Sequence, residues 1–363
     1  MLERGKGMKS FKEKIELFWK FFLEEETYLR QCLQNKDSFQ KARNRIEELI
    51  ESTFYTRSFQ IRFNSETNKW ELMLTPEGNK AKLFALSYWK ERAPEELLEY
   101  WSFYEMQKLM VTEAECTLEV CGIKIEIKDM SIYPSFEEDR INLEVYIDQI
   151  EDTDDSEVYM AFIILMQQFI GEVYDMSYIG EVELINRPKD EERITLPQLK
   201  AYIEEAINNY ELPLYEDLCE VYTIYELTPN PEHNRALRED VYKGKSALMS
   251  LIKEYYTGQL GTLDEGSQLG ITYGFIFFNT EKMSPESALN LQNRLEDQLI
   301  KINKEKHVVK YIGNATGLFR SYIDCIVFDM VEFISYLEEL LDKYDFEEIG
   351  FKVFKQGGKK IFF

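Results

Sequence analysis

The sequence predicts an α+β protein with mainly antiparallel sheets, and two patterns carry this prediction. Apolar side chains alternate with polar ones in residues 59–74 and again in residues 117–127, which is the period of half-buried hairpin strands. Apolar residues recur instead every three or four positions in residues 8–34 and 38–52, which is the period of amphipathic helices. Together these patterns indicate antiparallel sheets with helices packed on them.

Residues 269–354 give the clearest order of elements. A strand, a helix, two strands joined by a glycine turn, a second helix and a last strand follow one another there. Their expected positions are 271–278, a helix opened by Ser284 and Pro285, 307–311, 322–328, a helix from Met330, and 351–354. This β-α-β-β-α-β order is that of the ferredoxin-like fold, so we expect such a domain at the C-terminal end of the chain.

The length of 363 residues is too great for one ordinary core, so we expect two domains, residues 1–210 and 211–363. In the first, residues 156–174 are apolar on most sides and predict a buried helix, and residues 178–185 predict a closing strand.

In the second domain, residues 231–256 are expected to be mostly helical, and the glycine-rich residues 258–270 to form a flexible connector. An order of two strands, a helix and a strand, starting near Phe59, Ile123 and His307, leaves an internal duplication open.

The balance of charge limits the partners. Lys and Arg number 43 and Asp and Glu 67, which gives a formal charge of −24. Such a chain repels phosphate backbones and anionic lipid, so we expect no nucleic-acid partner, no membrane partner and, instead, a basic protein. Five cysteines without metal-ligand spacing, and no apolar run long enough for a signal peptide or a membrane span, predict a cytoplasmic protein with reduced thiols.

The most uneven charge lies between residues 137 and 157, where ten acids stand against Arg140 alone. A solvated loop, a docking surface for a basic protein and a metal site are the three interpretations. A calcium loop is disfavoured because residues 152–156 lack the required glycine and the distal glutamate. The acids that we assign to a docking surface are Glu137, Glu138, Asp139, Asp152, Asp154 and Asp155.

Candidate catalytic residues are few. His233 and His307 are the only histidines, which leaves little room for a histidine-based triad or metal site. Asp329 and Glu332 fit a capping box at a helix start. Asp324 shares a strand face with large apolar residues and needs a partner if it is buried. The glycines match no phosphate loop, so we predict no catalytic residue, no metal and no cofactor.

The strands of the C-terminal domain are apolar on both faces, although two helices cover only one. Phe275, Phe277, Tyr322 and Phe328 are therefore predicted to form an interface, either with the first domain or with a second copy of the chain. A homo-oligomer is one consequence that this leaves open.

In its element order and acidity, the C-terminal domain resembles small acidic ferredoxin-like proteins of the regulator of ribonuclease activity B type, and also immunity proteins that neutralise toxins. The resemblance covers about a quarter of the chain and implies binding and inhibition of a basic protein. The predicted function is thus a non-enzymatic interaction protein. An enzyme or a small-ligand or metal-binding protein with a carboxylate site between the domains is the alternative.

Overall fold

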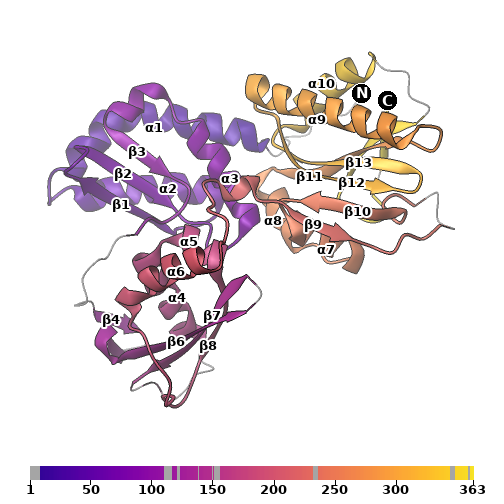
Figure 1. The fold of residues 1–363 in the computed structure, drawn as a ribbon. Helices are drawn as coiled ribbons and strands as arrows, with labels where there is room; N and C mark the ends of the chain where they lie inside the picture. The colour runs from indigo at the N-terminus through magenta and orange to yellow at the C-terminus, as the bar shows by residue number, and fades with distance from the viewer. Residues whose placement is uncertain are drawn as a thin grey trace. The chain divides into compact units, whose positions relative to one another are not determined.

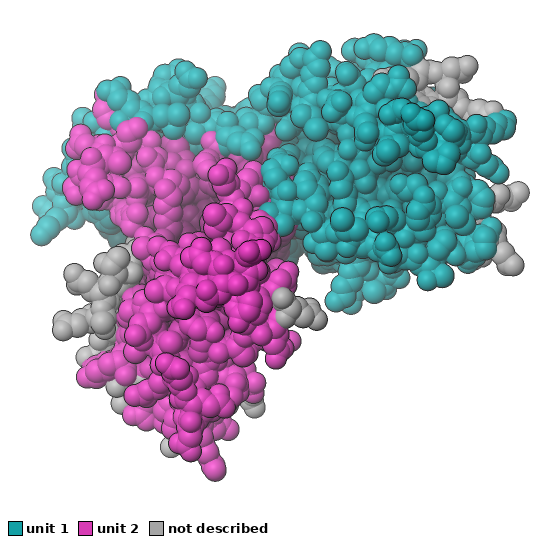
Figure 2. Space-filling view, in the orientation of Figure 1, with its two compact units in different colours: residues 1–57, 91–99, 219–363 teal, residues 58–90, 100–218 magenta. Residues whose placement is uncertain are grey.

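The computed structural model describes residues 9–109, 117–120, 123–137, 139–148, 150, 156–231, 236–343, 348–358 and 360–363. The protein is α+β, as predicted. It divides into two compact units, which Figure 2 distinguishes by colour. Unit 1 comprises residues 1–57, 91–99 and 219–363, and unit 2 comprises residues 58–90 and 100–218.

The predicted domain boundary therefore needs a correction. The expected crossing at residues 210 and 211 lies close to the observed one at 218 and 219, but residues 1–57 and 91–99 group with the C-terminal part. Part of the reason is the start of the first helix: Phe11 N donates to Gly270 O at 3.2 Å, and Lys12 N donates to Phe328 O at 3.1 Å. Hydrogen bonds over such sequence distances cannot be read from local periodicity.

Unit 1 is built on a seven-stranded antiparallel sheet with the strand order β15-β14-β11-β13-β12-β10-β9. Its strands are β9 (Thr223–Glu226), β10 (Val241–Ser246), β11 (Thr272–Asn279), β12 (Val309–Gly317), β13 (Arg320–Val327), β14 (Ile349–Val353) and β15 (Lys360–Phe362). Helices α9 (Pro285–Lys306) and α10 (Met330–Leu341) lie on one face, and α7 (Met249–Thr257) and α8 (Gly261–Leu269) on the other (Figure 1). The sheet is thus covered on both faces within one chain.

The first two helices of unit 1 are α1 (Phe11–Leu33) and α2 (Phe39–Phe54). Ser10 and Glu13 form a capping box that fixes the start of α1, and the left-handed Tyr55 ends α2. Short 3₁₀ turns lie at Glu95–Glu99 and Leu218–Glu220.

Two predictions for unit 1 are wrong. Residues 231–256 contain β10 before α7, because the strand pairs with β12 and β9 although its sequence is rich in lysine and serine. The expected connector at 258–270 is largely α8, which left-handed glycines at 258 and 270 bound on both sides.

Unit 2 contains three small sheets. Its strands are β1 (Phe59–Asn64), β2 (Lys69–Leu74), β3 (Trp101–Tyr104), β4 (Thr117–Val120), β5 (Ile123–Glu126), β6 (Met130–Glu137), β7 (Arg140–Ile147) and β8 (Ile179–Leu184). The hairpins β1-β2, β4-β5 and β6-β7 are antiparallel, whereas β2-β3 and β7-β8 are parallel.

The helices of unit 2 are α3 (Lys80–Glu91, assigned to unit 2 through Lys90), α4 (Ser156–Ile170), α5 (Glu172–Tyr178) and α6 (Leu196–Asn209), with a 3₁₀ turn at Ile127–Asp129. Helices α4 and α6 share one apolar core with strands β6 to β8 (Figure 1). The helix predicted at 156–174 is interrupted at Gly171, whose φ of 81° is left-handed, so that α5 starts anew at Glu172.

Candidate functional site

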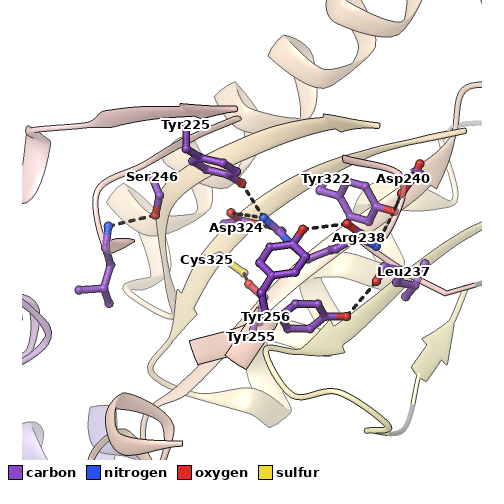
Figure 3. Close-up of polar contacts among 12 residues, drawn as sticks. Tyr225, Leu237, Arg238, Asp240, Ser246, Tyr255, Tyr256, Tyr322, Asp324 and Cys325 are labelled. Atoms are coloured by element: carbon purple, nitrogen blue, oxygen red, sulfur yellow. Dashed lines mark hydrogen bonds and ion pairs between the residues drawn. The ribbon is translucent and has the colours of Figure 1, made fainter. Parts of the chain in front are cut away.

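Asp324 of β13 is the predicted residue with the most distinctive surroundings, because it forms a fully buried ion pair (Figure 3). Arg238 Nη1 donates to Asp324 Oδ1 at 2.6 Å, and Nη2 lies 3.4 Å from Oδ2. Nη2 also donates to the hydroxyl of Tyr225 at 2.8 Å. Both charged side chains are 0% exposed. The partner that Asp324 needs in a core therefore comes from the loop before β10.

Aromatic rings enclose the Arg238 guanidinium. Its carbon lies 4.8 Å from the ring centre of Phe354, 5.2 Å from Phe275, 5.4 Å from Tyr322 and 6.0 Å from Tyr255. Guanidinium groups favour such ring faces because they are planar and weakly hydrated. The rings thus replace much of the water that Arg238 loses.

A second carboxylate holds the other end of the network. Tyr322 donates its hydroxyl proton to Asp240 and accepts from the Arg238 backbone N at 2.9 Å. Asp240 Oδ2 accepts from Phe319 N and Arg320 N, each at 3.0 Å, and thereby holds the turn between β12 and β13. Tyr255 and Tyr256 donate to the carbonyl oxygens of Leu237 and Arg238, as Figure 3 shows.

The protonation of this network follows from its burial. Desolvation lowers the pKa of Arg238, but Asp324, Tyr225 and Tyr256 together more than offset this effect, and the pKa is raised. Burial raises the pKa of Asp324, and Arg238 offsets only part of that rise. Burial also raises the pKa of Tyr255, to about 12, so this hydroxyl stays protonated as a donor.

The network has a structural rather than a chemical role. Arg238, Asp240 and Asp324 are at most 1% exposed, so a dissolved ligand cannot touch their charged atoms. Arg238 also adopts a left-handed φ of 69°, a conformation that the surrounding hydrogen bonds must hold. The arrangement fastens the loop before β10 to the middle of the sheet.

The predicted interface residues Phe275, Phe277, Tyr322 and Phe328 require a correction. All four are at most 2% exposed, because segments of the same unit cover them. Tyr255 of α7 and Phe354 pack edge-on against Phe275, at centroid distances of 6.0 and 5.2 Å.

Aromatic residues of unit 1 also cover Phe277 and Phe328, two other predicted interface residues. Phe362 packs against Phe277 at 5.8 Å, and Phe11 of α1 against Phe328 at 6.0 Å. This face is therefore core, and a second copy of the chain has no access to it.

Of the predicted acidic surface, Glu137 and Asp139 are exposed at the turn between β6 and β7. Glu138, Asp152, Asp154 and Asp155 lie outside the described residues. Glu137 belongs to a larger group on the solvent side of the β6-β7-β8 sheet, which we call the acidic face. Its acids are Glu137, Glu144, Asp148, Glu181 and Glu183.

The acidic face contains little compensating charge. Glu144 of β7 and Glu183 of β8 are direct partners in the parallel register, and Lys189 bonds to Glu144. Arg140 donates instead to the backbone oxygens of Met176 and Ile179. Like charges on directly paired positions oppose sheet formation, and Lys189, which interacts with both Glu144 and Glu183, offsets part of this repulsion.

The remaining sequence candidates have ordinary roles. Asp329 is the N-cap of α10 and accepts from Glu332 N at 3.0 Å, as predicted, although the Glu332 side chain pairs with Lys12 instead of completing a capping box. His307 is the left-handed C-cap of α9. Within the described residues, Cys32, Cys219 and Cys325 form no disulfide. His233, Cys116 and Cys121 lie outside the described residues.

Glu172 is a buried acid that sequence reasoning missed. Its side chain accepts from Thr75 Oγ1 and, at 2.5 Å, from Gln107 N, while its own N donates to Gln107 O. Burial raises its pKa to about 7. Its position directly after Gly171, at an interruption of an apolar helix, is the only sequence signal for an unusual role.

The described part of the chain has no group of three or more His, Cys, Asp and Glu residues arranged to hold a metal ion. Its helices include none that is both long and apolar enough to cross a membrane. Comparison of the chain with protein-family models, with curated proteins and with solved structures finds no match.

Proposed function

We propose that this protein is a non-enzymatic, cytoplasmic interaction protein that binds a basic protein through the acidic face of unit 2. The observation that carries the proposal is the direct pairing of Glu144 with Glu183 on an exposed sheet face. Paired like charges weaken a sheet, so a contribution to folding stability does not explain these two glutamates. A role in binding a partner explains them better. A cationic partner would supply opposite charge beyond that of Lys189, which already pairs with Glu144.

The charge of the whole chain supports the same proposal. A net charge of −24 attracts a cationic partner over a distance of about 10 Å at 0.1 M salt and raises its association rate. The acidic face would then set where the partner binds. Basic nucleases and toxins are the class of partner that the resemblance to acidic inhibitor proteins implies.

The order of elements in unit 1 supports a ferredoxin-like assignment as part of this proposal. The chain passes through β11, α9, β12, β13, α10 and β14, and the middle of the sheet has the order β14-β11-β13-β12. Strands β9, β10 and β15 would be additions at the two edges.

Affinity capture at two salt concentrations tests the function. The chain is immobilised, extract of the source cells is applied at about 0.1 M salt, and the bound proteins are eluted at about 0.5 M, where charge attraction is largely screened. We expect a basic protein that binds wild type and is released by salt. It should bind weakly to a variant with Glu144→Gln, Asp148→Asn and Glu183→Gln.

A matched control removes the same charge elsewhere. Glu95, Glu96 and Glu99 are exposed on a short turn of unit 1, and their change to Gln should leave capture intact. Equal loss with both triple variants would show that net charge alone is responsible. A partner retained unchanged at high salt, or no partner at all, would contradict the electrostatic mechanism.

A further inference from the structure

Unit 2 contains a pocket that carries positive charge although the chain is strongly acidic. The pocket has a volume of about 530 Å³ and is lined by residues from β1, α3, the segment after β3, the junction of α4 and α5, and α6. Four of its lining residues are basic and two are acidic. The basic ones are Arg62, Lys90, Lys108 and Lys200. This volume lies in the range of small-molecule sites.

The positive groups of the pocket have unused hydrogen-bond donors. Arg62 binds the buried Glu71 through Nε, and within the described residues its two terminal nitrogens donate to no protein atom. Lys108 is exposed, and its ammonium lies 3.7 Å from the ring centre of Tyr104. In the described part of the chain no carboxylate lies within ion-pair distance of this ammonium.

A buried amide adds a neutral donor. Gln107 lines the pocket and is only 6% exposed, yet its Nε2 has no hydrogen-bond partner among the described residues. An unbonded buried donor costs about 1–3 kcal/mol, so such groups generally have a bonding role. This nitrogen has almost no accessible surface, so the Gln107 side chain would turn toward the cavity to donate to a ligand oxygen.

The other basic residues are already partly balanced. Lys90 pairs with Glu105 at 2.7 Å, and Lys200 with Glu204 at 3.4 Å. Among the described residues Lys108 has no ion-pair partner, although the buried Glu71 carboxylate attracts it over a longer distance, and it lines the pocket together with Arg62. A bound anion is the simplest group that satisfies both cations and Gln107.

Apart from the acids Glu105 and Glu216, the rest of the wall is apolar or aromatic. Tyr104, Met106, Val173 and Tyr174 line it beside the charged residues. We infer that this pocket binds a small organic anion, a phosphate monoester or a carboxylate with an aromatic or apolar body. The anionic group lies against Arg62, Gln107 and Lys108, and the body packs on the tyrosines. This site uses different residues from the acidic face and does not depend on the proposed function.

Glu172 fixes the floor of this pocket. Its carboxylate and backbone N bond to both backbone groups of Gln107, and it sits between the lining residues Gly171 and Val173. The backbone that carries Gln107 is therefore held in place before a ligand arrives, which lowers the entropic cost of binding.

Calorimetric titration of the whole chain tests the site with four probes: phenyl phosphate, benzoate, inorganic phosphate and the neutral analogue phenol. We expect saturable binding of phenyl phosphate or benzoate, and the stronger of the two identifies the anionic group. Phenol should bind at least about tenfold more weakly, because it lacks the charge-assisted hydrogen bonds.

Two variants locate the site. Lys108→Gln should weaken binding of the preferred anion about tenfold. Gln107→Met removes a side-chain nitrogen that has no hydrogen-bond partner in the described part of the chain, so it should weaken binding while thermal unfolding without ligand stays at or above the wild-type temperature. Lys128→Gln, at a side chain that is 73% exposed and outside the pocket, is the matched control and should bind like wild type.

Three results would overturn the inference. One is the absence of binding for all four probes up to about 10 mM, which is weaker than any specific small-molecule site. Another is phenol binding as tightly as the anions. The third is an unchanged affinity in both Lys108→Gln and Gln107→Met.

Discussion

The buried ion pair of unit 1 and the basic pocket of unit 2 contain the same kinds of side chain in different roles, structural in the first and ligand-binding in the second. Arg238 has a carboxylate and a tyrosine hydroxyl as hydrogen-bond partners and is enclosed by four rings, with no exposed surface on its side chain. Arg62 has one carboxylate partner and an open side, next to Lys108 and an unbonded amide. Enclosure, rather than residue type, separates a charge that holds a fold from one that can hold a ligand.

The largest expected effect tests enclosure directly. Asp324→Ala leaves the Arg238 guanidinium buried without its carboxylate, and we expect a loss of about 3–5 kcal/mol in the free energy of unfolding. Urea unfolding followed by circular dichroism measures this loss. The double variant Arg238→Met with Asp324→Leu should lose less than Asp324→Ala, because no charge is then buried. A single variant within about 1 kcal/mol of wild type would show that the pair is not enclosed.

The next effect concerns Glu172, the buried acid below the pocket. Burial raises its pKa from 4.5 to about 7, so the folded state prefers the protonated acid. This contribution is fully present below about pH 4.5 and is lost as the pH rises through about 7.

Glu172→Gln removes that dependence. Between pH 5.5 and pH 8, wild type should lose about 2 kcal/mol more stability than the variant. Urea unfolding of both proteins at the two pH values gives the difference, in which the other titrating groups cancel. Parallel pH profiles would mean that this carboxyl reaches water.

A smaller effect is expected on the acidic face. Glu183→Gln removes the like charge opposite Glu144 and should stabilise the protein by about 0.5 kcal/mol at low salt. The gain should shrink at high salt as the repulsion is screened. Differential scanning calorimetry measures it, with Glu192→Gln in the exposed loop as a control. A destabilised Glu183→Gln variant would argue that this side chain has a structural partner.

The smallest effect completes the comparison. Lys108→Gln should change the free energy of unfolding by less than about 0.5 kcal/mol, since the ammonium is exposed and has no carboxylate within ion-pair distance among the described residues. The same urea experiment as for Asp324→Ala provides the number. A loss of more than about 1 kcal/mol would make Lys108 part of the fold and would remove the contrast with Arg238.

The sequence by itself determined the classes and approximate positions of many elements. Periodicity located α1, the β1-β2 hairpin and the elements from β11 to β14, and the residue types before Met330 located the N-cap Asp329. These predictions succeed because they depend on neighbours within about one helical turn or one hairpin. The alternation that placed Tyr322 and Asp324 on one face of their strand was likewise correct, because Arg238 contacts both.

Only the tertiary structure decided what covers each face and which charges meet. The sequence indicated that Asp324 needs a partner, but any of 43 basic residues qualified, and Arg238 lies 86 positions away in a polar run. In the same way, the apolar second face of the sheet suggested either the first domain or a second copy as its cover, whereas α7, Phe354 and the start of α1 cover it. Burial depends on residues that are distant in sequence and close in space, and local sequence patterns do not show which distant residues come into contact.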